Sequence, residues 1–373
     1  LIMKPFVDTC IRFLKRTVLC VAGILAFISA FFVHPSAAYI GYIDFRVLSL
    51  LFCLMLVVAG FQSIGLFHFL GSALLTKDGY TAINTGAFPA VLLSSMFITN
   101  DVSLLTFVPF GIMILTMTGQ QKLLISTIVL QTIGANLGSM FTPVGNPQNL
   151  YLASAFSVST GTFLMRMLPL TALSLILLVA AACMLPSASV DIASQPVEEQ
   201  PEPKKLAVYL ALFVVCLGCV SHLIPYPVML VLVLVTLLFT NRALFHKADY
   251  FLLLTFVFFF SFIGNVQNIP AVSDLLHKLI RGRELGAGIL LSQCISNVPA
   301  AILLSSFTDQ VTPLLYGVNI GGLGTLIASL ASLISYRFYV GTENAHTGRY
   351  MKVFTLYNVI FLVILALVAW KIL

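Results

Sequence analysis

The sequence predicts an all-α polytopic membrane protein, built from two inverted repeats with re-entrant hairpins and discontinuous helices. Hydrophobic residues make up 60% of the 373 residues and charged residues 9%. Soluble proteins are about 45–50% apolar and about 25% charged, so most of this surface must face lipid. Apolar stretches long enough to cross a bilayer recur along the chain. A short Gly/Asn motif also occurs twice, once in each half.

Nine apolar stretches fit full membrane crossings. The first follows a basic segment but no small-residue cleavage site comes after it, so we expect a retained helix and not a signal peptide. Two further stretches, 85–117 and 285–307, are interrupted by a polar tip and are expected to be re-entrant hairpins. The nine crossings are expected at 17–33, 47–65, 122–158, 163–185, 206–222, 226–240, 250–264, 311–336 and 353–370.

A hydrophilic segment divides the chain. Residues 186–205 are rich in Ser, Pro, Glu and Gln, the composition of a linker. We therefore expect a first inverted repeat at 1–185, a cytoplasmic linker at 186–205, and a bridging helix followed by the second repeat at 206–373.

The two halves repeat a motif. Residues 134–142 and 317–325 both read G-x-N-[L/I]-G-x-x-x-T, and each follows a hairpin tip, Thr99-Asn100-Asp101 or Ser296-Asn297-Val298-Pro299. Four crossings precede the linker and one extra helix follows it, so the second repeat starts from the opposite side. The sequence therefore predicts inverted repeats, an arrangement common among secondary transporters.

The positive charges predict the orientation. Alternating crossings place 13 of the 19 Lys and Arg residues on the side of the N-terminus. This bias is typical of cytoplasmic loops. We expect a multi-pass protein of the plasma membrane (the bacterial inner membrane), with the N-terminus in the cytoplasm and the C-terminus outside. The net charge of +6 is thus attributed to topology, and no nucleic-acid partner is expected.

Two segments occupy equivalent places before the hairpins. Residues 270–284 alternate apolar and charged faces at helical spacing, which favours an amphipathic helix in the membrane interface. The alternative is a simple charged loop. Residues 66–78 are the corresponding segment in the first half.

Two helices are expected to break near the middle of the membrane. The run 136–149 contains Gly138, Pro143, Gly145 and Pro147, and the run 319–325 is similarly rich in glycine. In lipid, irregular backbone persists only where it is buried in protein or lines a cavity. The N-termini of half-helices suit an anion, and freed carbonyls suit Na⁺.

Polar side chains gather at the two tips and the two breaks. The alternative for each amide or hydroxyl alone is ordinary hydrogen bonding between helices. Taken together, they predict substrate ligands and Na⁺ ligands. The predicted substrate-binding residues are Thr99, Asn100, Ser103, Asn146, Asn149, Ser296, Asn297 and Thr325. The predicted Na⁺ ligands are Asn100, Asp101, Asn136, Thr142, Gly145, Asn297, Asn319 and Gly322.

Asp101 is the carboxylate that lies within a predicted membrane hairpin. A charge at the bilayer centre costs about 2.5–3.5 kcal/mol on insertion scales, so such residues usually bind ions, carry protons or pair. We predict that Asp101 is protonatable or binds the coupling cation. A compatible alternative is that Asp101 caps a half-helix starting at Val102.

These motifs resemble the ion transporter superfamily. That group contains ArsB-type arsenite permeases, Na⁺/H⁺ antiporters of the NhaD type, citrate transporters and divalent-anion:sodium symporters. The resemblance lies in the two tips, in Thr142-Pro143-Val144-Gly145-Asn146-Pro147-Gln148-Asn149, and in the 317–325 loop. It implies a homodimer with a scaffold and a mobile transport domain, working as an elevator with alternating access. The segments 66–78 and 270–284 would be its interfacial arm helices.

The tips and the broken stretch resemble different branches of the superfamily. Asn-Asp and Asn-x-Pro tips are more similar to arsenite permeases and antiporters, whereas Gly-Asn-Pro-Gln-Asn is more similar to anion transporters. Our first hypothesis is a Na⁺- or H⁺-coupled secondary transporter, by symport, of a small anion, either a di- or tricarboxylate such as citrate or an inorganic oxyanion. The alternatives are a Na⁺/H⁺ antiporter and an arsenite or antimonite efflux permease.

The sequence carries no signature of an enzyme. It contains no H-E-x-x-H and no G-x-S-x-G motif. The expected partners are therefore the small anion, the coupling cation (Na⁺ or H⁺), the lipid bilayer and a second copy of the chain. No further cofactor is expected.

Overall fold

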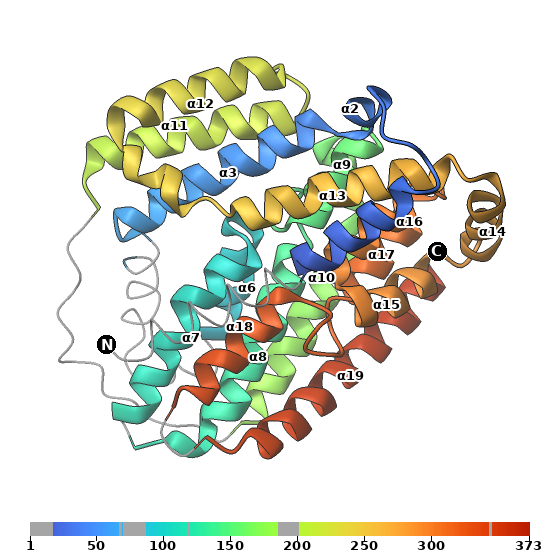
Figure 1. The fold of residues 1–373 in the computed structure, drawn as a ribbon. Helices are drawn as coiled ribbons and strands as arrows, with labels where there is room; N and C mark the ends of the chain where they lie inside the picture. Colours follow the sequence, from blue (N-terminus) through green and yellow to red (C-terminus); the bar gives the residue numbers. More distant parts are fainter. Residues whose placement is uncertain (1–17, 67–68, 70–86, 118, 186–200, 343–344) are drawn as a thin grey trace.

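The computed structural model describes residues 18–66, 69, 87–117, 119–185, 201–342 and 345–373, and within these ranges all regular structure is helical (Figure 1). The chain is an all-α polytopic membrane protein. Its helices are Val18–Ala30, α2 (Ala38–Tyr42), α3 (Phe45–Ser63), α6 (Ala87–Ile98), α7 (Asn100–Met117), α8 (Leu124–Ser139), α9 (Pro147–Ala155), α10 (Thr160–Cys183), α11 (Pro203–Val220), α12 (Tyr226–Thr240), α13 (Tyr250–Gln267), α14 (Pro270–Ile280), α15 (Glu284–Ile295), α16 (Asn297–Ser305), α17 (Val311–Ile320), α18 (Leu330–Val340) and α19 (Thr347–Ile372), with 3-10 turns η1 (Gln121–Leu123) and η2 (Arg242–Lys247).

Five helices in the described ranges are long and apolar enough to cross a membrane: α3, α10, α11, α13 and α19. Their surfaces fit that environment. Helix α19 leaves Leu356, Val363 and Trp370 more than 40% exposed, a pattern that suits a lipid-facing side. The shorter apolar helices include α7, α12, α15 and α17.

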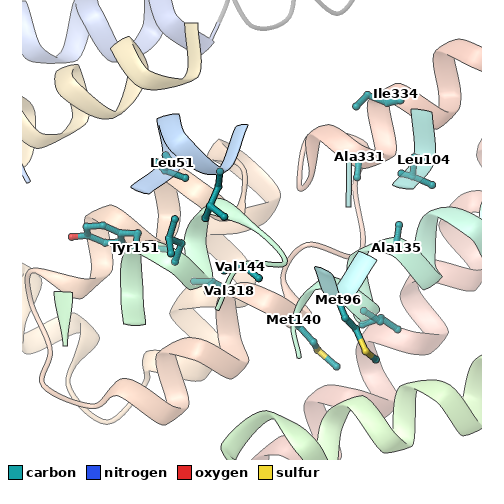
Figure 2. Close-up of a cluster of buried hydrophobic side chains, with 14 of the residues drawn as sticks. Leu51, Met96, Leu104, Ala135, Met140, Val144, Tyr151, Val318, Ala331 and Ile334 are labelled. Carbon is teal, nitrogen blue, oxygen red and sulfur yellow. The ribbon is translucent and has the colours of Figure 1, made fainter. Parts of the chain in front are cut away.

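The helices form two groups. Helices α3, α11 and α12 lie side by side, with α13 running below them (Figure 1). The second group contains the helical hairpins α6–α7 and α15–α16, together with α8, α10, α17, α18 and α19. Side chains from both halves of the sequence share one buried core, in which Figure 2 shows Leu51, Val144, Val318 and Ile334. The site described below lies where the two groups meet.

Both predicted hairpins are present, and each turns at its predicted polar tip; that they are re-entrant in the membrane stays a prediction. The first turns at Thr99, between α6 and α7, and the second at Ser296, between α15 and α16. Each half then continues with a helix, a break and a second helix, in the same order. The inverted relation between the halves and the domain division stay predictions.

The structure corrects the predicted extent of both breaks. Helix α8 continues through Ser139 and α9 already begins at Pro147, so the first break is 140–146 and not 136–149. The second break is 321–329, later than the predicted 319–325, because α17 continues through Ile320. Proline fits the first turn of α9 because its missing N–H has no partner there in any helix.

The structure tests one of the two predicted arm segments and leaves the other outside the described residues. Residues 270–280 form the expected helix, α14, and its place in the membrane interface stays a prediction. The corresponding segment 66–78 lies almost entirely outside the described residues, as do 186–200 of the linker. The linker was predicted to extend to residue 205, but α11 begins at Pro203.

Candidate functional site

The two hairpin tips share an uncommon backbone conformation. Thr99 has φ +70° and Ser296 has φ +74°. Positive φ is disfavoured for residues with a Cβ and is a genuine outlier for a β-branched threonine. In each hairpin the next residue, Asn100 or Asn297, begins the second helix. The tips are therefore tight, fixed turns that place an asparagine at the start of a helix.

The first tip, the first broken helix and the second break meet at the side chain of Asn136. Its Oδ1 accepts hydrogen bonds from Asn100 Nδ2 at 3.1 Å and from Ser329 Oγ at 2.9 Å. Its Nδ2 donates to the carbonyl of Gly322 at 3.4 Å. A single amide in the last turn of α8 thus joins three segments that are distant in the sequence.

Asn319 makes the matching connection from the second half. Its Nδ2 donates to Asn149 Oδ1 at 2.7 Å and to the carbonyl of Leu315 at 2.8 Å, and its Oδ1 accepts from Asn146 Nδ2 at 3.2 Å. The two amides of the first half are thereby held by α17. We call Asn100, Asn136, Asn146, Asn149 and Asn319 the asparagine network.

Asn149 also satisfies the carbonyls of the first break. Its Nδ2 lies 3.1–3.3 Å from the carbonyls of Ser139, Met140 and Thr142. The last carbonyls of a helix have no partner within the helix, and leaving them bare inside a membrane protein is costly. Asn149 therefore stabilises the backbone of the break.

Two cavities border the network. A cavity of about 210 Å³ lies between α3, the first tip, the first break and the start of α13. A smaller cavity of about 60 Å³ lies between the first tip, the second tip and α13. Both are lined by Asn100, Asp101, Pro147, Asp249 and Leu252, so they adjoin at this point.

Three charged residues from the described part of the chain line these cavities. Asp101 lies in the first turn of α7, and its N–H donates to Asn100 Oδ1 at 2.9 Å. Asp249 caps α13, because its Oδ1 accepts from Leu252 N at 3.1 Å. Lys247, two residues earlier, lines the larger cavity. The predicted capping role of Asp101 for a helix beginning at Val102 is wrong, since α7 already begins at Asn100.

Six of the predicted site residues line one cavity or both. They are Thr99, Asn100, Asp101, Asn146, Ser296 and Asn297. Asn297 is 5% exposed, and its Nδ2 makes no hydrogen bond to the part of the chain that the structure describes, so this donor is available to a ligand in the smaller cavity.

The other predicted residues line neither of these two cavities and instead hold the backbone. Ser103 bonds to Ser94 across the first hairpin, and Thr142 donates to the carbonyl of Met96. Thr325 is exposed and bonds to Gln293. The rest of this group are the network residues Asn136, Asn149 and Asn319 and the glycines Gly145 and Gly322.

Gly145 and Gly322 require glycine for different structural reasons. A Cβ on Gly145 would lie 2.1 Å from the carbonyl oxygen of Ser139, so the break can close only over a glycine. Gly322 offers its carbonyl to Asn136, and a Cβ there would meet Asn297 Nδ2 at 2.9 Å. Both are positions of close backbone approach.

Sequence reasoning missed several residues at the site. Lys247 and Asp249 lie in a short polar connection between two predicted crossings, where charges are ordinary. Ser329, just beyond the predicted second break, bonds to Asn136, and Gln293 holds the carbonyls of Gly321 and Leu323 at 2.9 and 3.0 Å. A polar Gln within an apolar hairpin helix is a signal that could have found Gln293.

Comparison with known proteins agrees with a multi-pass membrane protein. The family model described as "Citrate transporter" matches residues 1–313. An uncharacterized transporter of Methanocaldococcus jannaschii is 32% identical over 325 residues, which cover 87% of this chain and 88% of that protein. The inner membrane protein YbiR of Escherichia coli is 30% identical over 340 residues, 89% of this chain and 88% of that protein.

A more distant similarity covers one region. The silicon efflux transporter LSI3 of Oryza sativa subsp. japonica is 32% identical over 129 residues, which cover 34% of this chain and 26% of that protein.

Proposed function

This chain belongs to the citrate transporter family, and on that premise we propose that it is a Na⁺- or H⁺-coupled secondary transporter of a small anion such as a di- or tricarboxylate. Family membership supports the broader statement, a secondary transporter of anions in a membrane. The coupling ion and the substrate are the parts that we add.

The observation that carries the proposal is the charge of the cavity lining. Among the described residues, Asp101 and Asp249 line both cavities, and Lys247 lines the larger one. An anion that enters alone would approach these two carboxylates, and their repulsion costs Coulomb energy in a medium of low dielectric. Co-binding of a cation or a proton removes that cost. The two carboxylates therefore support the proposed coupling.

The anion and the cation are proposed to bind at different parts of the site. The start of α16 and the Asn297 amide line the smaller cavity, where Asn297 Nδ2 and the positive end of the helix dipole favour an anionic group. Asp101 and Asp249 are hard oxygen ligands suited to Na⁺, or bases suited to a proton. The remaining predicted Na⁺ ligands of the asparagine network would then support the site by holding its backbone.

Three further features belong to the same proposal. The inverted repeats, elevator-type movement and a homodimer are what the superfamily resemblance implies. Hydrogen bonds between Asn146, Asn149 and Asn319 support movement of both halves as one unit. The orientation with a cytoplasmic N-terminus rests on the distribution of Lys and Arg.

A second candidate is efflux of a hydroxylated metalloid such as arsenite. The similarity to a silicon efflux transporter favours it. The described lining of the larger cavity, which has amides and carboxylates beside Lys247, does not demand a strongly charged substrate. A Na⁺/H⁺ antiporter without an organic substrate remains the other alternative.

One experiment separates the three. The protein is reconstituted in proteoliposomes, and uptake of labelled citrate, succinate, phosphate, sulfate and arsenite is measured under imposed Na⁺ or pH gradients. Gradient-driven uptake of an anion supports the first proposal, and movement of arsenite alone supports the second. Na⁺-driven proton flux without movement of any solute would leave the antiporter.

A further inference from the structure

One side of α3 lines the larger cavity with apolar side chains. These residues are spaced by three and four along the helix, so they lie on the same face. They are Leu51, Leu54, Met55, Val58 and Ala59, which we call the α3 row. Leu51, Leu54, Val58 and Ala59 are 5–7% exposed, so this face of α3 points into the protein.

The same cavity is polar where the first tip and the first break line it. Thr99, Asn100 and Asn146 are its neutral polar residues there. Small-molecule sites commonly combine a mostly apolar lining with a few polar groups that fix the orientation of the ligand. A ligand of the larger cavity therefore meets an apolar face on α3 and polar groups at the tip.

The lining of the larger cavity by α3 is long. It runs from Leu51 to Gln62, eleven residues later, which is about 16 Å at 1.5 Å per residue. The volume is about 210 Å³, below the roughly 300–1,000 Å³ of pockets for drug-sized ligands. A cavity that is long but small in volume is narrow, so it suits an extended chain better than a branched ligand.

The far end of the α3 row is polar again. The Gln62 side chain makes no hydrogen bond to the part of the chain that the structure describes, and Lys247 lines the same cavity. Both side chains carry N–H donors. They can therefore receive a second carboxylate, so that the apolar part of the ligand lies between two polar regions.

The larger cavity continues into the smaller one. Both are lined by Asn100, Pro147 and Leu252, and the smaller one contains Asn297 and the start of α16, where we place an anionic group. A carboxylate bound there can extend its hydrocarbon chain along the α3 row. An inorganic oxyanion has no hydrocarbon to bury, and it would lose water against the row without gaining a partner.

We propose that the α3 row binds the hydrocarbon chain of an extended, unbranched carboxylate whose first carboxylate group lies in the smaller cavity. The row then sets the chain length that the protein prefers. This inference narrows the anion of the proposed function and rests on it for its role in transport. Binding of the chain itself does not depend on coupled transport.

Calorimetric titration of the purified full-length protein in lipid nanodiscs tests the binding. The ligands are succinate, glutarate, adipate and pimelate, which differ only in their number of methylene groups, and empty nanodiscs are the blank. Each buried methylene contributes about 0.8 kcal/mol, so we expect Kd to fall about four-fold per methylene until the cavity is full. Citrate and sulfate are expected to bind more weakly than the best ligand of the series. A Kd that is constant or rises from succinate onward would overturn the proposal.

Two substitutions in the α3 row test its role in length selection. Ala59→Leu fills part of the larger cavity, so pimelate is expected to bind at least about ten-fold more weakly, the loss of about two buried methylene groups, while succinate binds as before. The matched control is Ala180→Leu, at an exposed position of α10. Leu54→Ala enlarges the cavity and is expected to move the optimum to a longer chain. An unchanged length preference in both row variants would show that the row does not select, and the wild-type series decides whether the chain binds if neither variant folds.

Transport of the same ligands in proteoliposomes separates this proposal from the proposed function. Binding that improves with chain length, without transport of any ligand, would contradict the proposed function and uphold the α3 row as the chain site. Coupled transport of citrate or sulfate, together with binding that ignores chain length, would uphold the proposed function and overturn the inference about α3.

Discussion

Asn319→Ala tests whether the asparagine network holds the two halves together. The substitution removes the donor to Asn149 Oδ1 (2.7 Å) and the acceptor of Asn146 Nδ2 (3.2 Å). Each buried group left without a partner costs about 1–3 kcal/mol. Asn146 keeps a second bond, to Ser139 at 3.2 Å, so its loss is the smaller one. We expect the free energy of unfolding to fall by about 2–4 kcal/mol.

The control is Asn358→Ala, on α19. Asn358 is also buried, but its Nδ2 donates to the carbonyl of Phe354 within the same helix and its Oδ1 has no partner in the described chain. Removing it leaves no side chain of another helix unpaired, so we expect a change within about 1 kcal/mol.

Thermal unfolding in detergent, followed by intrinsic fluorescence, measures both variants. The Asn319→Ala protein is expected to unfold at a clearly lower temperature and to lose transport, while Asn358→Ala behaves as the wild type. Equal unfolding temperatures for the two variants would refute the view that the amides joining the two halves contribute more to stability than an amide that bonds within its own helix.

Three further predictions follow from the cavity and the packing. Asp101→Asn removes a titratable group from both cavities and is expected to abolish or alter the pH dependence of transport; an unchanged pH profile would exclude a coupling role. Lys247→Ala removes a positive charge from the larger cavity, which adjoins the proposed anion site, and is expected to raise the KM for the anion about ten-fold, equivalent to about 1.4 kcal/mol of binding energy, with folding unchanged. An unaltered KM would argue against an electrostatic contribution of Lys247 to anion binding. Gly138→Ala places a Cβ 2.1 Å from the Leu92 carbonyl oxygen and is expected to lower the free energy of unfolding by about 1–3 kcal/mol. The control Gly161→Ala is expected to be tolerated, because there is open space around that position. Similar unfolding temperatures for the two variants would contradict the close contact of α6 and α8.

Helix content and the hairpin tips could be predicted because each depends on local sequence. Long apolar stretches must be surrounded by lipid or buried in protein and therefore predict membrane helices. Polar tips such as Thr99-Asn100-Asp101 interrupt these stretches and mark the turns. The limits of the breaks could not be predicted in the same way. Gly138 and Pro147 weaken an isolated helix, yet one packs against the Leu92 carbonyl and the other begins α9.

The residues of the cavity were harder to predict than those of the tips. Asp249 and Lys247 belong to a connection whose sequence resembles any short polar loop. They reach the cavities only because the start of α13 lies across these cavities from the first tip. Asn149, in contrast, was predicted as a substrate ligand because of its residue type. Its amide is used on the carbonyls of the break, a role that depends on three-dimensional placement.

The bonds between the halves also bear on how the protein is made. The oxygen of the Asn149 side chain accepts its hydrogen bond from Asn319, which is synthesised 170 residues later. At about 5–20 residues per second, a ribosome needs roughly 9–34 s to synthesise that interval. During this time the first half has entered the membrane with an amide oxygen that has no permanent partner. Newly made first halves must therefore keep this site hydrated or shielded until the second half arrives, and truncated chains ending at the linker should be degraded quickly.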